Sequence, residues 1–352
     1  MYYPLKFKPL YKDYIWGGRN LELLGKKLPE GKVAESWELS CHPDGQSIIS
    51  NGIFKDMSLG YFIKKYGYEV IGHSLPYSAI EKFPLLIKFI DANDRLSVQV
   101  HPNDDYARLH ENGELGKNEM WYIISAKEGA KLVYGVAPGT TKGSFKTAIE
   151  EGRINECLNY VSVKPGDFLN IPAGLVHAIG EGIVLAEVQQ NSNTTYRVYD
   201  YDRVDKNGNK RPLHVEKALE VIDFKSSCFS EKAEGLGYDE SEYSRCIKIV
   251  NNYFAIEHID LHGSITEDAD GSKFYIYIFT QGSGQIKYQG GSIDVRFGET
   301  VLIPASLGEY TIEGTITAIK TYVPESKDGV IKSLKDSGFS KEEILKNVAG
   351  LG

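Results

Sequence analysis

Residues 95–102, with the sequence RLSVQVHP, limit most tightly what this chain can fold into. If they form a strand, successive side chains point to opposite faces. Ser97, Gln99 and His101 then share one face, and the other face carries only apolar side chains that can join a core. A row of polar groups inside a β-rich domain costs free energy unless the groups bind something. The stretch therefore predicts a strand that presents polar groups to a ligand inside a barrel.

A second stretch, residues 166–177, has the spacing G-x5-P-x-G-x2-H. Glycine and proline at these positions are typical of turns. The spacing predicts a turn, a strand, a second turn and then His177, whose side chain would be aimed by the turn before it.

Residues 117–124 predict another strand, on which Glu119, Trp121 and Ile123 share a face. A carboxylate among apolar neighbours is costly to bury without a partner. A metal ion beside Glu119 would remove that cost.

Together these motifs resemble the cupin barrels, in which the second spacing aims a histidine at a metal. More closely, Gln-x-His-Pro, a glutamate within Gly-Lys-x-Glu-x-Trp-Tyr, and Pro-Ala-Gly-x-x-His, in this order, resemble the type I mannose-6-phosphate isomerases in their short bacterial form. The resemblance covers nearly the whole chain, from WGG at 16–18 and ESWE at 35–38 to YRVYD at 196–200. It implies a mainly β fold of two cupin (jelly-roll) barrels with a helical insertion.

The resemblance also implies one metal ion per chain. Cupins usually carry H-x-H and then a glutamate, and here a glutamine stands in place of the first histidine. The implied ligands are Gln99, His101, Glu119 and His177. This set of nitrogen and oxygen donors suits Zn²⁺ and leaves room for water or substrate.

Three residues are implied to bind the phosphate of a sugar phosphate: Lys88, Ser97 and Arg203. Lys88 interrupts the apolar strand predicted at 83–91, where a lysine could otherwise reach solvent along its stem. An ammonium group is a good phosphate partner. Arg203 lies in an Arg/Asp-rich loop that would otherwise be a solvated run of weak ion pairs. The family often has a lysine there, and the guanidinium fork of arginine also suits phosphate.

The catalytic residues are the least defined part of the implied site. Arg197 is expected to project into the pocket and stabilise developing negative charge. Lys117, two residues before Glu119, is one candidate for the base, because a lysine near zinc can have a lowered pKa. A metal-bound water and Asp205 are the other candidates.

Two further strands carry polar residues that could line the site, at 33–39 and 182–191. For the first strand, packing in a sheet that covers the barrel is the simpler explanation. The polar residues are Glu35 and Glu38 in the first strand, and Glu187, Gln189 and Asn191 along one face of the second.

An internal repeat indicates a second barrel. Residues 298–309 parallel residues 166–177 with the same glycine-to-proline distance, but Glu309 replaces the histidine. The run at 273–279 parallels the strand of Glu119, with Lys273 near the place of the glutamate. The predicted organisation is a metal-binding catalytic cupin domain over 1–138 and 159–224, a helical insertion over 139–158, and a metal-free cupin-like domain over 225–352.

Composition excludes several classes of protein. With 352 residues the chain can bury a sizeable core, and its net charge of -8 argues against a nucleic-acid partner. No apolar run is long enough to span a bilayer, and the first eight residues lack the apolar core of a secretory signal. The four cysteines are scattered, which favours free thiols in a cytoplasmic protein. Nothing in the sequence implies an obligate protein partner.

The function implied by the resemblance is an aldose–ketose isomerase that interconverts D-mannose 6-phosphate and D-fructose 6-phosphate. Zinc would assist a proton transfer through a cis-enediol. The main alternative is a non-catalytic cupin that binds a sugar. A cupin epimerase or oxygenase is a further possibility, but an oxygenase iron site usually has more histidines than this set provides.

Overall fold

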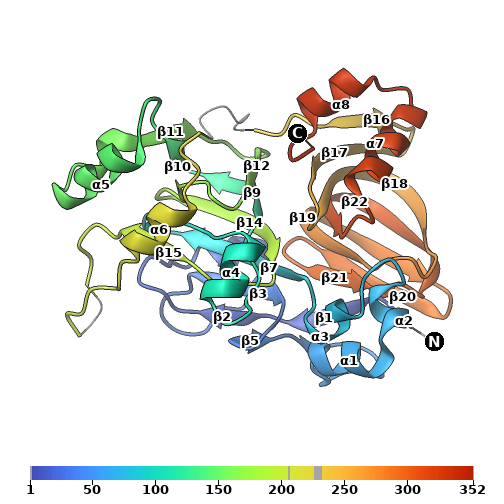
Figure 1. Ribbon diagram of the computed structural model, residues 1–352. Helices are drawn as coiled ribbons and strands as arrows, with labels where there is room; N and C mark the ends of the chain where they lie inside the picture. The colour runs from blue at the N-terminus through green and yellow to red at the C-terminus, as the bar shows by residue number, and fades with distance from the viewer. Residues whose placement is uncertain (1, 205–206, 226–231, 352) are drawn as a thin grey trace.

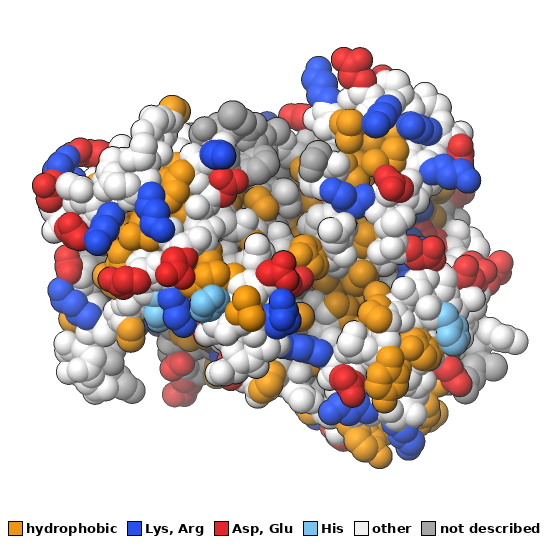
Figure 2. Space-filling view, viewed as in Figure 1, with side chains coloured by type: hydrophobic (Ala, Val, Ile, Leu, Met, Phe, Trp, Pro, Cys, Tyr) orange, Lys and Arg blue, Asp and Glu red, His pale blue; other side chains and the backbone are white. Residues whose placement is uncertain are grey.

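The computed structural model describes residues 2–204, 207–225 and 232–351. The chain is mainly β, as the sequence predicts, and it forms two β domains that lie side by side. The first runs from blue through green to yellow in Figure 1, and the second is orange to red. On the face shown in Figure 2, acidic and basic side chains are interspersed.

Two sheets form the first domain. The larger sheet contains β2 (Leu10–Lys12), β3 (Glu35–Leu39), β7 (Leu85–Ala92), β9 (Glu119–Ala126), β12 (Phe168–Ile171) and β14 (Ile183–Gln190), in the order β12-β9-β14-β7-β3-β2. The smaller sheet contains β8 (Val98–Val100), β10 (Lys131–Val136), β11 (Leu158–Ser162), β13 (His177–Ala178) and β15 (Tyr196–Tyr199), in the order β11-β10-β13-β8-β15. Apolar side chains of both sheets, such as Trp121 and Leu132, pack in one core. The polar site described below lies at one end of this core.

The second domain repeats the larger sheet. Its strands are β16 (Leu236–Asp239), β17 (Tyr243–Val250), β18 (Ala255–Ala269), β19 (Tyr275–Tyr288), β20 (Gly291–Arg296), β21 (Thr300–Ile303) and β22 (Gly308–Tyr322). They pair in the order β21-β19-β22-β18-β17-β16, with β20 beside β19. Without β20, the six strands of this sheet follow one another across the sheet in the same order as the six strands of the larger sheet. β21 corresponds to β12, β19 to β9, β22 to β14, β18 to β7, β17 to β3 and β16 to β2. The internal repeat seen in the sequence is therefore also a repeat of topology.

The N-terminal strand lies in a different domain from the one predicted for residues 1–138. β1 (Leu5–Lys8) pairs with β21 of the second domain, and β6 (Ile48–Ile49) pairs with β1. The chain thus begins in the sheet that was assigned to 225–352. An unpaired edge strand exposes backbone donors and acceptors, and β1 covers the edge of β21.

Helices are short and lie outside the sheets. The predicted insertion at 139–158 contains α5 (Lys142–Glu150) and the 3-10 helix η2 (Ile154–Cys157). The others are η1 (Asn20–Leu24), α1 (Leu59–Tyr66), α2 (Tyr68–Ile71), α3 (Ser78–Glu81), α4 (Asp104–His110), α6 (Val215–Val221), α7 (Lys327–Asp336) and α8 (Lys341–Asn347). A small hairpin joins β4 (Cys41–His42) to β5 (Gly45–Gln46). In Figure 1, α5 projects from the first domain, and α7 and α8 cover one end of the second.

Two glycines shape the turns before and after β12. Gly166 has φ 92° and Gly174 has φ 88°, a region that residues with a Cβ rarely adopt. The Gly174 turn leads directly into β13, whose first residue is His177. The sequence spacing therefore sets the direction from which this histidine enters the domain.

Cys41, Cys157 and Cys246 are free thiols, whereas Cys228 lies outside the described residues. Among the described residues, no helix combines the length and apolar character that crossing a bilayer requires.

Candidate metal centre and active site

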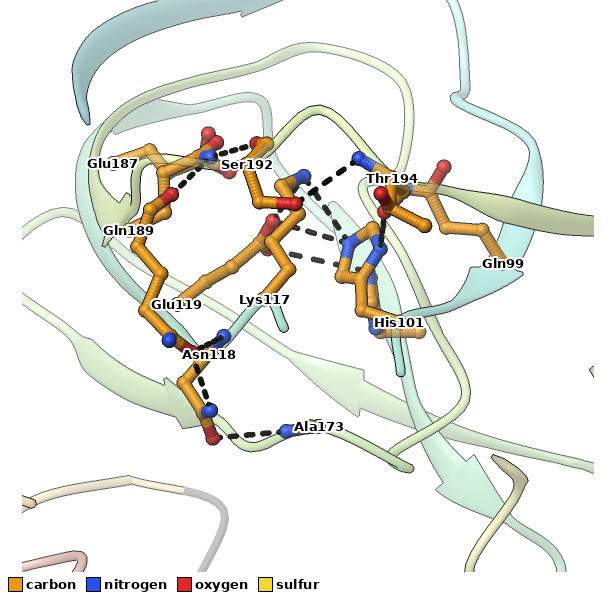
Figure 3. A network of polar contacts seen from close by, with 12 residues as sticks. Gln99, His101, Lys117, Asn118, Glu119, Ala173, Glu187, Gln189, Ser192 and Thr194 are labelled. Atoms are coloured by element: carbon orange, nitrogen blue, oxygen red, sulfur yellow. Dashed lines mark hydrogen bonds and ion pairs between the residues drawn. The ribbon is translucent and has the colours of Figure 1, made fainter. Parts of the chain in front are cut away.

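Strands from both sheets of the first domain bring three buried side chains together. His101 follows β8, His177 opens β13, and Glu119 opens β9. In the smaller sheet His177 pairs directly with Gln99. His101 Nε2 lies 3.1 Å from Glu119 Oε1, and His177 Nε2 lies 4.0 Å from Glu119 Oε2. The ligand atoms of the three side chains lie within 4.8 Å of one another, and Figure 3 shows Glu119 directed toward His101.

Backbone carbonyls fix the orientation of both imidazoles. His101 Nδ1 lies 2.9 Å from the carbonyl oxygen of Thr194, and His177 Nδ1 lies 2.9 Å from that of Leu175. A carbonyl only accepts, so each Nδ1 carries a hydrogen and each Nε2 presents a lone pair toward Glu119. Burial lowers the pKa of both histidines, to about 3 for His101. Neutral imidazoles are the form that binds a metal.

The fourth implied ligand, Gln99, lies beside the other three. Its Nε2 is 3.4 Å from His177 Nε2. Because the two ends of an amide are assigned from their partners, a flipped Gln99 would present its oxygen to the site. Glu119 Oε1 has no hydrogen bond of good geometry among the described residues, although Lys117 Nζ lies 2.6 Å away. Two imidazole nitrogens, a carboxylate and an amide oxygen fit a divalent cation.

Gln99 and Glu119 of this set form part of the wall of a cavity of about 220 Å³, and His101 and His177 are buried next to them. Its apolar wall includes Trp16, Ile90, Leu96, Trp121 and Ile179. Its charged and polar wall includes Glu35, Lys88, Ser97, Gln99, Lys117, Glu119, Glu187, Arg197 and Arg211. Two of the candidate metal ligands, Gln99 and Glu119, thus face the same space as Lys88, Lys117 and Arg197.

A buried ionic triad crosses three strands in the wall of this cavity. Lys88 Nζ on β7 lies 3.6 Å from Glu35 Oε2 on β3 and 3.2 Å from Glu187 Oε1 on β14. Burial alone would lower the pKa of Lys88, but the two carboxylates outweigh it and hold the pKa above its usual value. The ammonium charge is therefore already balanced by protein groups. This differs from the expectation that Lys88 serves a phosphate.

Glu187 links the triad to the metal centre. The indole Nε1 of Trp121 lies 3.0 Å from Glu119 Oε2 and 3.0 Å from Glu187 Oε2, so it donates to both. Burial, together with the charge of Glu119, raises the pKa of Glu187 to about 7, although Lys88 opposes the rise. The other oxygen of Glu187 has no hydrogen bond of good geometry among the described residues. Glu187 is thus a carboxylate on the cavity wall with capacity to exchange a proton.

Comparison with known proteins identifies the family. Residues 5–131 match the family described as phosphomannose isomerase type I, catalytic domain, and residues 246–323 match mannose-6-phosphate isomerase, cupin domain. Mannose-6-phosphate isomerase ManA of Bacillus subtilis is 39% identical over 321 residues, which are 91% of this chain and 99% of that protein. The chain belongs to the type I phosphomannose isomerases. It is therefore an enzyme with cupin architecture, and the isomerase interpretation is favoured over a non-catalytic sugar-binding cupin.

Two further relatives support the assignment. The mannose-6-phosphate isomerase of Streptococcus mutans is 35% identical over 327 residues, covering 92% of this chain and 99% of that protein. The crystal structure of the mannose 6-phosphate isomerase from Bacillus subtilis superposes with a TM-score of 0.83 at 35% identity, covering 90% of this chain and 99% of that one. Because both relatives align over nearly their full lengths, the likeness includes both barrels.

In this phosphomannose isomerase the predicted arginines have different surroundings. Arg197 lies on β15 opposite Gln99 and faces the cavity, and its Nη1 donates to the carbonyl of Pro212 at 3.0 Å. Arg203 is not part of the cavity wall. Its Nη2 donates to Asp200 Oδ1 at 2.6 Å, and its Nη1 donates to the carbonyl of Arg95 at 2.5 Å. These partners hold Arg203 away from the place that the sequence analysis expected.

Arg211 is a cavity residue that sequence reasoning missed. Its Nε donates to Asp200 Oδ2 at 2.8 Å, so Asp200 holds Arg203 and Arg211 at once. No motif singled it out, because it follows a polar turn and looks like a solvated charge. Asp205, one of the predicted candidates for the base, lies outside the described residues.

Proposed function

We propose that this isomerase interconverts D-mannose 6-phosphate and D-fructose 6-phosphate with one Zn²⁺ per chain. The observation that carries the proposal is the convergence of Gln99, His101, Glu119 and His177 beside one cavity, whose wall includes Gln99 and Glu119. The Bacillus subtilis and Streptococcus mutans relatives carry the name of this activity. A zinc ion bound there would polarise an oxygen of the open-chain sugar.

The reaction moves a proton between C1 and C2 through a cis-enediol, so one group must take the proton and return it. We assign this role to Glu187. Among the cavity carboxylates, Glu119 belongs to the metal set, and Glu35 accepts from Trp37 Nε1 at 2.7 Å. Glu187 keeps one oxygen without a hydrogen bond of good geometry. Lys117, the candidate from the sequence, is paired with Glu119 instead.

Negative charge develops on the substrate oxygens as the proton leaves carbon. Lys117 and Arg197 both face the cavity and place positive charge close to the metal set. Fixed cations in a site shielded from water stabilise such charge without having to reorganise. Both residues are therefore proposed to stabilise the enediolate.

The phosphate would be bound at the arginine-rich part of the cavity wall. We assign this contact to Arg211 and the hydroxyl of Ser97, because both face the cavity and Arg203 does not. Lys88 is assigned to position Glu187 rather than to hold the phosphate, since two carboxylates already surround it. Phosphate binding remote from C1 and C2 would hold the carbon chain in place for the proton transfer.

The cellular compartment is proposed to be the cytoplasm. This proposal is supported by Cys41, Cys157 and Cys246, which form no disulfide among the described residues. Thiols kept apart in this way are typical of a reducing compartment.

A coupled assay of mannose 6-phosphate turnover tests the function, run alongside metal analysis of the purified protein. We expect about one zinc per chain, activity lost after dialysis against a chelator, and activity restored by Zn²⁺. Full turnover in metal-free protein would contradict the metal assignment. Absence of turnover in the zinc-loaded protein would contradict the isomerase function itself.

A further inference from the structure

A cavity of about 370 Å³ opens at one end of the second barrel, beneath α7. Its polar wall includes Arg245, Glu257, Lys273 and Tyr322. Ligand pockets in proteins start at about this volume and combine an apolar lining with a few placed polar groups. No role in the isomerisation has been assigned to this part of the molecule.

Strand pairing shows that this cavity corresponds in position to the catalytic one. In the first barrel, Glu35 pairs with Ile90 and Trp37 pairs with Lys88. In the second barrel, Arg245 pairs with Ile259 and Ile247 pairs with Glu257. Since β3 and β7 correspond to β17 and β18, Arg245 has the place of Glu35 and Glu257 has the place of Lys88.

The next strand extends the correspondence. Lys88 pairs with Glu187, and Glu257 pairs with Lys320. The triad Glu35–Lys88–Glu187 is therefore matched by Arg245–Glu257–Lys320, with every charge reversed.

The pairing of β19, the next strand of the sheet, shows that Lys273 does not have the place of Glu119 that the sequence predicted. Trp121 pairs with Glu187, and Tyr277 pairs with Lys320. Counting two residues back along each strand places Tyr275 where the first barrel has Glu119. Two residues further back, Lys273 has the place of Lys117 rather than that of the glutamate. Three residues that line the second cavity thus have counterparts that line the catalytic cavity.

Stability alone does not account for these charges in the second barrel. Glu257 and Lys320 are each 5% exposed, and Glu267 forms ion pairs with both Lys320 and Arg245. A buried ion pair is commonly no more stabilising than apolar residues of similar size, because both charges must leave water. The cluster therefore calls for another explanation, such as a ligand.

Two buried atoms of the residues that line the cavity make no hydrogen bond. Glu257 Oε2 and Arg245 Nε form an ion pair 3.6 Å apart, but neither has a hydrogen bond among the described residues. One is an acceptor and the other a donor. A hydroxyl group reaching between them could donate to the first and accept from the second.

The apolar lining of the cavity comes from Val330 and Leu334 of α7, and from Leu236 and Ile247 on the sheet beside the polar residues. Figure 2 shows hydrophobic side chains at this end of the molecule, among charged ones. A carbon skeleton could pack on this lining while its hydroxyl groups face the polar residues.

We propose that the second barrel binds an uncharged polyhydroxyl compound, a free sugar or sugar alcohol, between its polar wall and α7. Charge decides the class of ligand. Arg245 and Lys320 balance Glu257 and Glu267, and at the rim Lys273 balances Glu325. An anion would need a net positive pocket and a cation a net negative one. This site is distinct from the catalytic cavity and does not depend on the isomerase proposal.

The experiment uses zinc-loaded, full-length protein and measures binding of D-mannose, D-fructose and mannitol by saturation-transfer NMR. Fructose 6-phosphate is present throughout at high concentration to occupy the catalytic cavity. Ser333 is on the rim of the second cavity, and Ser333→Trp would fill it. The matched control is Lys332→Trp, an exposed change on the same helix that does not face the cavity.

We expect saturable binding of at least one of the three compounds in the wild-type protein. Ser333→Trp should weaken it about tenfold or more, whereas Lys332→Trp should leave it unchanged. Glu257→Gln, which keeps the side-chain volume, should also weaken binding. Isomerase activity should be the same in both tryptophan variants, which shows that they fold. The proposal is overturned if none of the three compounds binds, if both tryptophan variants bind equally, or if a further increase in the fructose 6-phosphate concentration weakens the sugar signal.

Discussion

The two barrels of this phosphomannose isomerase use one sheet order to bury opposite charges. At matching positions the first barrel has Glu35, Lys88 and Glu187, and the second has the reverse set described above. Backbone pairing therefore fixes which positions point inward, and it leaves the sign of each charge free. What differs between the barrels is the chemistry that surrounds equivalent positions.

The first barrel combines its triad with metal donors, and the described residues of the second form no such donor group. Tyr275 replaces the carboxylate of Glu119, and Glu309, which follows the second turn as His177 does, is exposed. The first barrel can therefore concentrate positive charge from a metal and arginines around an anionic substrate. The second balances its charges internally.

The largest expected effect comes from comparing His177 with Glu309, the residues that follow the corresponding turns of the two barrels. His177→Ala should lose bound zinc and lower kcat/KM roughly 10³-fold or more, because a metal contributes several kcal/mol to catalysis. The control is Glu309→Ala, which changes the corresponding residue of the second barrel and should alter neither property. Metal analysis and steady-state kinetics of both variants provide the check, and a zinc-free His177→Ala protein with normal activity would refute the assignment.

The next effect compares Glu187 on β14 with Lys320, the residue at the corresponding position on β22. Glu187→Gln should lower kcat by about 10²- to 10⁴-fold, the usual contribution of a general base. Its zinc content should not change. Lys320→Gln should leave kcat unaltered but lower the free energy of unfolding by about 3–5 kcal/mol, since it leaves Glu257 and Glu267 buried with less compensation. Kinetics and denaturant unfolding distinguish the two roles, and equal kcat values for the two variants would remove Glu187 from the mechanism.

A smaller effect tests how the first barrel binds its anion. Arg211→Ala should raise KM for mannose 6-phosphate about 10- to 100-fold, the range for losing a charge-assisted hydrogen bond. Arg203→Ala should raise KM less, because Arg203 does not line the cavity and contacts Arg211 only indirectly, through the shared partner Asp200. Inhibition by inorganic phosphate gives a second readout. A larger KM change in the Arg203 variant would return the phosphate contact to that residue.

The smallest effect concerns the contact between the barrels. His258 of β18 packs on Tyr122 and Phe168 of the first barrel, with ring centroids 6.0 and 5.3 Å away. Burial lowers its pKa, although Asp260 opposes the shift and Lys248 adds to it. Below about pH 6.5 the unfolded chain therefore binds a proton that the folded chain does not. The free energy of unfolding then decreases as the pH is lowered.

The variant His258→Gln should lose less stability than the wild type between pH 7 and the acid limit of folding. The expected difference is about 1.4 kcal/mol for each unit by which the pKa is lowered. Unfolding by denaturant at several pH values measures it. Identical pH profiles in the two proteins would show that His258 is not the titrating group.

Much of the metal site could be predicted from the sequence, because strand alternation and the glycine turns are local properties. Placing Gln99 and His101 on one face of a strand needs only a period of two. The residues proposed to bind the phosphate could not be predicted in the same way. Arg203 and Arg211 look equally exposed in the sequence, and the choice between them depends on how Asp200 is positioned.

By itself, the sequence determined the β-rich class, the repeat, and the kinds of donor that could meet at a metal. Only the tertiary structure decided that Lys88 is enclosed by two carboxylates, that Arg211 faces the cavity, and that β1 completes the second sheet. The reason is that burial and ion pairing join strands far apart in the chain. The energy of a charge depends on those neighbours more than on its own residue type.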